Sequence, residues 1–186
     1  MPPKVKVTKE AVVDAAVEIV RKDGEASLNA RTVAAVLGCS TQPVFSNFAT
    51  MEQLRDAVLA KVYVIYKNYI DREMAKGEYP AYKASGMAYI RFAKEEKELF
   101  RLLFMRDRSK ESPKKDTADD PEIEKLLQKS TGLTDDETKL FHLEMWAYVH
   151  GIATMFVTGY LDLDWELVSK ILSDAYQGMR KQYGGV

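Results

Sequence analysis

The chain has 186 residues, of which 46% are hydrophobic and 30% are charged, and its formal net charge is −1. This composition is typical of a soluble globular protein and excludes an intrinsically disordered one. A single cysteine excludes an intrachain disulfide and leaves no thiolate cluster for a metal. The sequence contains no apolar run of 18 residues and begins without the hydrophobic core of a signal peptide, so we expect a cytoplasmic protein with no membrane partner.

Apolar residues recur at helical spacing over most of the chain, which predicts an all-α fold of about nine helices. The sequence has only 6 Pro and 10 Gly, and residues 49–76 contain neither, so that stretch predicts one long helix. Thr8 is expected to cap the first helix and Gly24 to end it. The helices expected before residue 49 span about residues 8–22, 29–37 and 41–47.

The segment Leu37-Gly38-Cys39 predicts a tight turn between the second and third of these helices. Gly38 can take the left-handed conformation that ends a helix, and the Ser40 hydroxyl is expected to cap the next one. Pro43 then falls in the first turn of that helix, where a missing N–H breaks no hydrogen bond. The pattern is typical of a helix-turn-helix, which we place at about residues 29–48.

Uncharged polar side chains occupy most exposed positions of the predicted third helix. These side chains donate and accept hydrogen bonds, which suits base edges in the major groove of double-stranded DNA. Gln42 and Asn47 are the best candidates for reading bases, because an amide can form two hydrogen bonds with adenine. The alternative is an ordinary polar helix face. The helix residues predicted to contact DNA are Thr41, Gln42, Pro43, Ser46 and Asn47.

The predicted DNA-binding region carries little net positive charge. Residues 1–48 contain six Lys or Arg and five Asp or Glu. Lys4 and Lys6 belong to a short basic stretch, which predicts either an arm in the minor groove or a solvated tail. Arg31 stands at a helix start, which favours a phosphate contact.

The chain is expected to contain two domains. We place a DNA-binding domain at residues 6–66 and a helical ligand-binding and dimerisation domain at residues 67–186. Thr50 and Gln53 have the spacing of a capping box, which opens the long helix that leaves the first domain. Nine of the fifteen residues from 107 to 121 are charged and show no apolar period, which predicts a mobile loop.

A second capping box, Thr134 to Glu137, predicts a long helix to about residue 161. Its apolar residues form two adjacent stripes, which is a wider arc than one supporting face requires. A last helix is expected from Trp165. These two antiparallel helices would make half of a four-helix bundle that a second copy completes, which predicts a homodimer.

Aromatic residues and Met are frequent in the C-terminal half. Together they predict an adaptable apolar cavity for a small-molecule effector, whereas any one of them alone is better explained as ordinary core. The residues expected to line this cavity are Tyr89, Phe92, Phe104, Met105, Trp146, His150 and Phe156.

The sequence contains no pattern that indicates catalysis, a metal or a cofactor. His142 and His150 are eight residues apart on one predicted helix, which is too far to share a metal. Neither a Ser/His/Asp order nor a glycine-rich phosphate loop is present. A helical enzyme that uses His150 with a carboxylate is the least favoured alternative, and we expect no enzyme.

The N-terminal motifs occur in a specific order and spacing. They are Gly24, Arg31-Thr32-Val33-Ala34, Leu37-Gly38-Cys39-Ser40 and Phe45-Ser46-Asn47-Phe48. Over about residues 8–61 this pattern resembles the TetR (tetracycline-repressor-like) family of transcriptional regulators. The C-terminal half resembles a subgroup with a Trp-x-x-x-His-Gly motif, matched here by Trp146, His150 and Gly151.

The resemblance implies a homodimer with one DNA-binding head per subunit and a ligand cavity in the C-terminal domain. The two heads would bind successive major grooves of a pseudo-palindromic operator. In such proteins a bound ligand changes the spacing of the heads and releases DNA, so a repressor is expected.

Three positions depart from the family pattern. The family commonly has Lys at the position of Thr41, Tyr at that of Phe45, where the hydroxyl meets a phosphate, and often Lys at that of Met51. We therefore predict weak non-specific DNA binding that decreases with salt.

Other groups could replace some of these phosphate contacts. Arg31, Thr50 and the arm with Lys4 and Lys6 are the candidates. The departures also leave an alternative function, a ligand-binding helical protein of the same fold with little DNA affinity.

Overall fold

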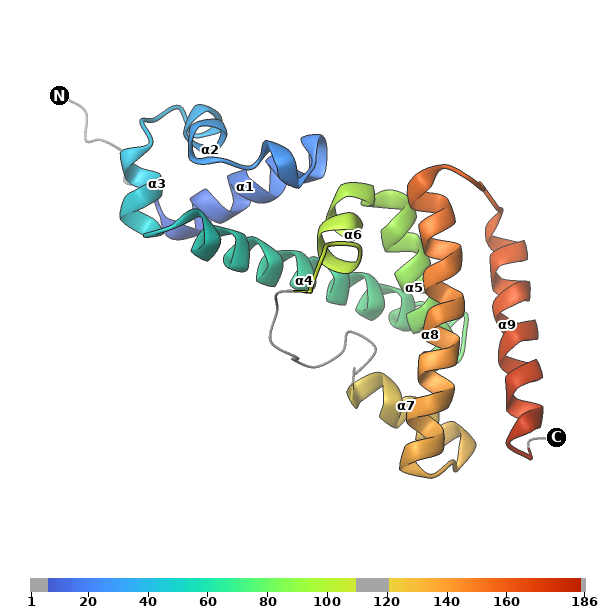
Figure 1. Cartoon of the computed structure of the whole chain (residues 1–186). Coiled ribbons are helices and arrows are strands. Elements are labelled where there is room, and N and C mark those ends of the chain that lie inside the picture. Colours follow the sequence, from blue (N-terminus) through green and yellow to red (C-terminus); the bar gives the residue numbers. More distant parts are fainter. Residues whose placement is uncertain (1–6, 110–120, 185–186) are drawn as a thin grey trace. The chain divides into compact units, whose positions relative to one another are not determined.

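The computed structural model describes residues 7–109 and 121–184 (Figure 1). Within these ranges the chain forms nine α-helices and one 3₁₀ helix and has no strand, as the sequence predicts. The element bounds are α1 Lys9–Asp23, η1 Glu25–Ser27, α2 Ala30–Val36, α3 Gln42–Asn47, α4 Met51–Ala75, α5 Ala81–Glu95, α6 Lys97–Phe104, α7 Pro121–Thr131, α8 Asp135–Thr158 and α9 Trp165–Gln182.

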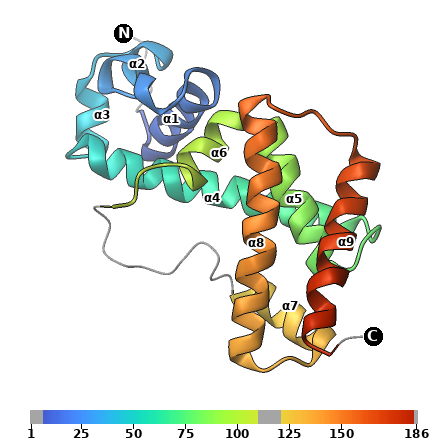
Figure 2. The same cartoon turned by 45° about the vertical axis from the view of Figure 1, so that its right-hand side comes forward.

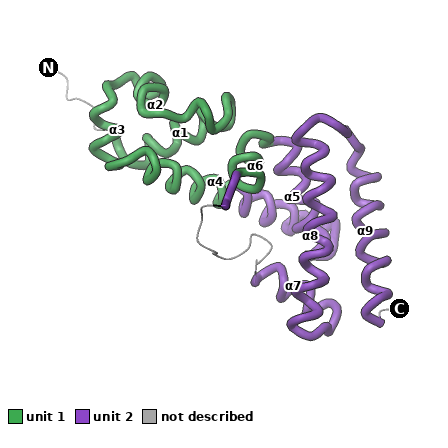
Figure 3. The backbone as a smooth tube through the Cα atoms, in the orientation of Figure 1, with its two compact units in different colours: residues 1–65, 96–106 green, residues 66–95, 107–186 purple. Residues whose placement is uncertain are grey.

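The chain divides into two compact units (Figure 3). Unit 1 comprises residues 1–65 and 96–106, and unit 2 comprises residues 66–95 and 107–186. Helix α6 therefore belongs to unit 1, whereas the sequence predicts a second domain that begins at residue 67. Most of the segment predicted as a charged loop, residues 110–120, lies outside the described residues.

Unit 1 has an apolar core among α1, α2, α3, the first part of α4 and α6. Val12, Val33, Val44 and Leu54 are fully or almost fully buried there. Helix α6 contributes buried aliphatic and aromatic side chains and packs on α1. The Arg21 guanidinium of α1 also donates to the Glu96 carboxylate, with an Nε–Oε2 distance of 2.8 Å.

Local capping signals explain where the first helices begin. The Thr8 hydroxyl accepts the Ala11 N–H, as predicted, and Asn29 and Thr32 form a reciprocal capping box at the start of α2. Gly38 has a positive φ of 62° in the turn, also as predicted. The prediction for Ser40 is wrong: the N-cap of α3 is Thr41, and no side chain caps that helix.

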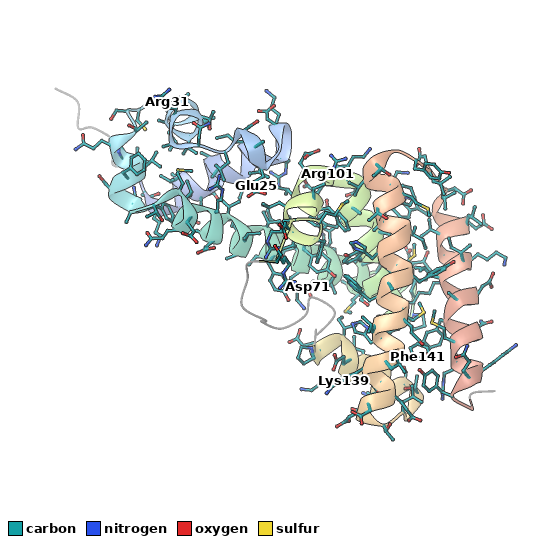
Figure 4. The ribbon with its side chains drawn as sticks, viewed as in Figure 1. Glu25, Arg31, Asp71, Arg101, Lys139 and Phe141 are labelled. Atoms are coloured by element: carbon teal, nitrogen blue, oxygen red, sulfur yellow. The ribbon has the colours of Figure 1, made fainter. Side chains whose placement is uncertain are left out.

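In unit 2, α5 and α8 run parallel, and α9 runs antiparallel beside α8 (Figures 1 and 2). The predicted capping box at the start of α8 is present, with the Thr134 hydroxyl accepting the Glu137 N–H. Phe141 of α8, labelled in Figure 4, makes ring contacts with Tyr176 and Tyr183 at the C-terminal end of the chain.

Helix α8 ends earlier than the sequence predicts. Gly159 takes the left-handed conformation and closes the helix after Thr158. Tyr160, which would have extended the first apolar stripe, therefore lies beyond the helix and is 79% exposed. No helix in the described ranges is both long and apolar enough to cross a membrane.

Candidate functional site

Helix α3 of unit 1 has one buried and one exposed side. Val44 is buried in the core, whereas Gln42, Phe45 and Ser46 are exposed. These three residues follow the spacing i, i+3 and i+4, so they share one face of the helix. We call Gln42, Phe45 and Ser46 the α3 face.

The two polar side chains of the α3 face differ in what they offer a partner. The Ser46 hydroxyl donates to the Gln42 backbone carbonyl, with an O–O distance of 2.9 Å, so it faces outward as an acceptor. The Gln42 side-chain amide makes no hydrogen bond within the described residues. It therefore keeps its donors and its acceptor for an external group.

Asn47, predicted to read bases, has an amide that is engaged within the chain. Its Nδ2 donates to the Pro43 carbonyl at 2.8 Å and to the Val7 carbonyl at 3.2 Å. Both amide hydrogens are therefore used, and only Oδ1 remains as an acceptor. Asn47 ties the chain before α1 to helix α3, a role that its sequence position does not reveal.

The other predicted DNA contacts have varied positions. Arg31 is exposed in the first turn of α2, as Figure 4 shows. Thr41 and Pro43 are partly exposed at the start of α3. Thr50 accepts the Gln53 N–H at 3.2 Å, which is the capping contact that the sequence predicts. Lys4 and Lys6 lie outside the described residues.

Unit 2 contains an aromatic cluster around His150. The Tyr89 hydroxyl lies 2.8 Å from Nδ1 of His150, and the Trp146 ring stacks on the imidazole with a centroid distance of 4.9 Å. Burial lowers the pKa of His150 and raises the pKa of Tyr89, because both charged forms lose solvation. A neutral imidazole can accept the tyrosine hydrogen at Nδ1.

A second Tyr–His pair repeats this contact on the same two helices. The Tyr82 hydroxyl lies 3.0 Å from Nδ1 of His142, and burial raises the pKa of Tyr82. The tyrosines are seven residues apart on α5, and the histidines are eight apart on α8. This pair was not predicted from the sequence, although the similar spacings of Tyr and His on the two helices are a signal that indicates it.

The structure brings together only some of the predicted cavity residues. Tyr89, Trp146 and His150 are in contact, and Phe92 approaches the same region through Tyr66, which meets both Tyr89 and Phe92.

The remaining three cavity residues have other neighbours. Phe156 stacks near Trp165. Phe104 contacts Phe100, and Met105 is exposed; both belong to unit 1.

Unit 2 also buries a charge that sequence reasoning missed. Glu73 of α4 is 2% exposed, and its Oε2 accepts from Lys76 at 2.7 Å and from Arg91 at 3.2 Å. The Arg91 guanidinium also lies over the Trp165 ring, 4.2 Å from its centroid. Among the described residues, no three His, Cys, Asp or Glu side chains are grouped so that they could hold a metal ion.

A family model described as tetracyclin repressor-like, C-terminal domain, matches residues 82–173. A solved structure of a TetR family member from Streptomyces coelicolor A3 shares the fold with a TM-score of 0.65 at 18% identity, over 90% of this chain and 96% of that one.

Residues 82–173 therefore belong to the tetracyclin repressor-like C-terminal domain family, and the chain shares the fold of a TetR family member.

Other TetR-like neighbours are structures of the multidrug binding protein EbrR. The complex with imidazole has a TM-score of 0.58 at 17% identity, over 90% of this chain and 88% of that one. The complex with malachite green has a TM-score of 0.60 at 18% identity, over 94% of this chain and 98% of that one. A comparison with curated proteins gives no match.

The match to the tetracyclin repressor-like domain bears on the predicted function. TetR family members are transcriptional regulators and not enzymes, which agrees with the prediction that this chain is not an enzyme. The all-α fold prediction is confirmed by the same structural neighbours. The Trp-x-x-x-His-Gly subgroup stays a prediction.

Proposed function

We propose that this chain is a homodimeric DNA-binding regulator of the TetR family, which a small molecule releases from a pseudo-palindromic operator. The observation that carries the proposal is the α3 face, where the free amide of Gln42 lies on the exposed side of the second helix of a helix-turn-helix. Such a helix enters the major groove, where an amide distinguishes adenine from other bases.

Contacts to the DNA backbone are the weaker part of this proposal. Arg31 is exposed in the first turn of α2 and makes no ion pair within the described residues, which suits a phosphate contact. Thr41, Pro43 and Thr50 lie near the two ends of α3 and are further candidates. Few of these candidate contacts are Lys or Arg side chains. The affinity for DNA should therefore be modest, and it should decrease only gradually as the salt concentration rises.

An exposed apolar face of α8 supports the homodimer. Leu140, Leu143, Ala147, Gly151 and Met155 recur at spacings of three, four, four and four, and the three larger side chains are exposed. Small residues in the middle of this face would allow a close approach by another helix. A second copy would bury the face in an isologous interface, as twofold symmetry requires.

The aromatic cluster around His150 supports a ligand-responsive C-terminal unit. Tyr89, Trp146 and His150 offer flat apolar surface together with a hydroxyl and an imidazole, a combination that suits a planar organic molecule. EbrR, which shares the fold, binds imidazole and malachite green in its solved complexes.

The DNA-binding proposal is tested with the DNA that flanks the coding region, in gel shifts at low salt. We expect a specific shift with the wild-type protein that Gln42→Ala removes, because the exposed amide is lost without a change in the core. Gln177→Ala is the matched control, since Gln177 is an exposed glutamine on α9 of unit 2. Equal operator affinity of Gln42→Ala and wild type would contradict the assignment of α3.

The dimer is tested by sedimentation at micromolar concentration. We expect Ala147→Glu to shift the protein to monomer, because two like charges would meet across the interface. Lys125→Glu, at an exposed position of α7, is the control and should leave a dimer. A wild-type protein that sediments only as a monomer would overturn the homodimer.

The second candidate function is a ligand-binding protein of the same fold with little DNA affinity. The engaged amide of Asn47 favours it, because one predicted base reader has no donor left for DNA. No gel shift at micromolar dimer, together with binding of malachite green, would favour this function over the first.

A further inference from the structure

Phe45 is an aromatic side chain on an otherwise polar helix face. It is 50% exposed, whereas its neighbours Val44 and Phe48 are buried. It follows Gln42 by three residues, so the ring and the Gln42 amide lie beside each other on the α3 face. About half of the Phe45 side chain therefore lies outside the core of unit 1.

The chemistry of the major groove limits what this ring could contact there. Base edges in the groove present nitrogen and oxygen atoms, and their one apolar group is the C5 methyl of thymine. An aromatic ring has no donor or acceptor for the polar atoms, but it can cover a methyl group and remove it from water.

The neighbours of Phe45 on the α3 face fit the same base pair. An A·T pair places adenine N7 and N6 next to thymine O4 and the methyl group. The Gln42 amide can bond adenine N7 and N6 at once, and the outward Ser46 oxygen accepts hydrogen bonds. The face thus combines an adenine reader with an apolar group at its side.

We infer that Phe45 contacts the 5-methyl group of a thymine in each operator half-site, the partner of the adenine that Gln42 reads, and so makes the protein select an A·T pair at this position. This inference rests on the proposed function, because it requires α3 to lie in the major groove. It adds a specificity-determining residue whose contact is apolar, without a hydrogen bond.

The test uses a duplex that the wild-type protein selects from a random DNA library. Each thymine of the selected half-site is replaced in turn by deoxyuridine, which removes only the 5-methyl group. We expect one thymine per half-site at which this replacement weakens wild-type binding about fourfold, as for one buried methyl group. The other thymines should show ratios near one.

Two variants then assign the methyl contact to Phe45. Phe45→Ala should bind the thymine and deoxyuridine duplexes equally, whereas Phe45→Leu keeps an apolar group and should retain part of the preference. Val36→Ala is the control, because Val36 is 59% exposed on α2 of the same unit and should leave the preference unchanged. Circular dichroism should show all three variants folded, since both positions are exposed.

The outcomes separate this inference from the function on which it rests. A selected duplex that Phe45→Ala binds with the wild-type thymine preference would overturn the methyl contact alone. A uniform loss of affinity with an unchanged preference would do the same and assign Phe45 to the sugar–phosphate backbone. Failure to select any duplex at low salt would overturn both the methyl contact and the proposed DNA binding.

Discussion

The two units of this chain differ in where they keep their polar groups. The described core of unit 1 is entirely apolar, and its polar side chains lie at exposed or partly exposed positions, including those on α2 and α3. Unit 2 buries Glu73, Ser85, Thr138 and His142. The proposed function accounts for this difference, because a unit that binds DNA through its surface needs only a rigid interior, whereas a ligand site uses a few polar groups inside the unit.

The largest effect should come from the buried carboxylate of unit 2. Glu73→Ala leaves the Arg91 and Lys76 charges without their shared partner, and we expect the free energy of unfolding to fall by about 3 kcal/mol. Urea unfolding measures this change. Asp174→Ala, which breaks an exposed pair with Lys170, should cost less than about 0.5 kcal/mol. Equal losses in the two variants would mean that burial does not distinguish these ion pairs.

A hydroxyl placed in the apolar core of unit 1 should have the next largest effect. Val33→Thr conserves volume but buries an unpaired oxygen, so the free energy of unfolding should fall by about 2 kcal/mol. Val36→Thr on the exposed side of the same helix is the matched control and should change it by less than about 0.5 kcal/mol. A tolerated Val33→Thr would show that unit 1 accepts buried polar groups as unit 2 does.

The reverse substitution in unit 2 should stabilise the protein. The buried Thr138 hydroxyl has no hydrogen-bond partner among the described residues, so Thr138→Val should raise the free energy of unfolding by about 1 kcal/mol. Thr158→Val, at the exposed end of the same helix, serves as the comparison in thermal unfolding. Destabilisation by Thr138→Val would instead indicate that the hydroxyl is paired in solution.

The smallest effect should be a pH dependence from His150. Its pKa is lowered in the folded state, so below about pH 6.5 the unfolded chain binds a proton that the folded chain does not. The free energy of unfolding should therefore fall as the pH decreases through this range, and the contribution is complete above it. His150→Gln should reduce this slope in urea titrations. If the free energy of unfolding of His150→Gln had the same pH dependence as that of the wild type, His150 would not be one of the buried polar groups that distinguish unit 2.

Local signals allowed most helix starts to be predicted. Thr8, Asn29 and Thr134 mark their helices correctly, because a cap depends on residues within one turn. The prediction that Ser40 caps α3 is wrong, because the helix begins one residue later and its N-cap is Thr41. The end of α8 was placed too late, since the apolar pattern continues past the left-handed Gly159.

Contacts between segments that are distant in sequence were much harder to predict. The Tyr82–His142 and Tyr89–His150 pairs span 60 and 61 residues, and periodicity does not say which helices meet. The engagement of Asn47 with the Val7 carbonyl is also non-local. The α3 residues could be proposed from the sequence because exposure on a short amphipathic helix follows from its period.

The place of helix α6 in unit 1 decides whether either unit can be cut from the chain as one continuous piece. Because residues 96–106 complete unit 1, the chain passes between the units at residues 65, 95 and 106, so neither unit is a continuous piece. A fragment cut after residue 66 would lack the side chains that cover α1. A chimera that joins this N-terminal segment to another regulator would therefore need to supply an equivalent of α6, and recombination at a single crossover would expose apolar surface on α1.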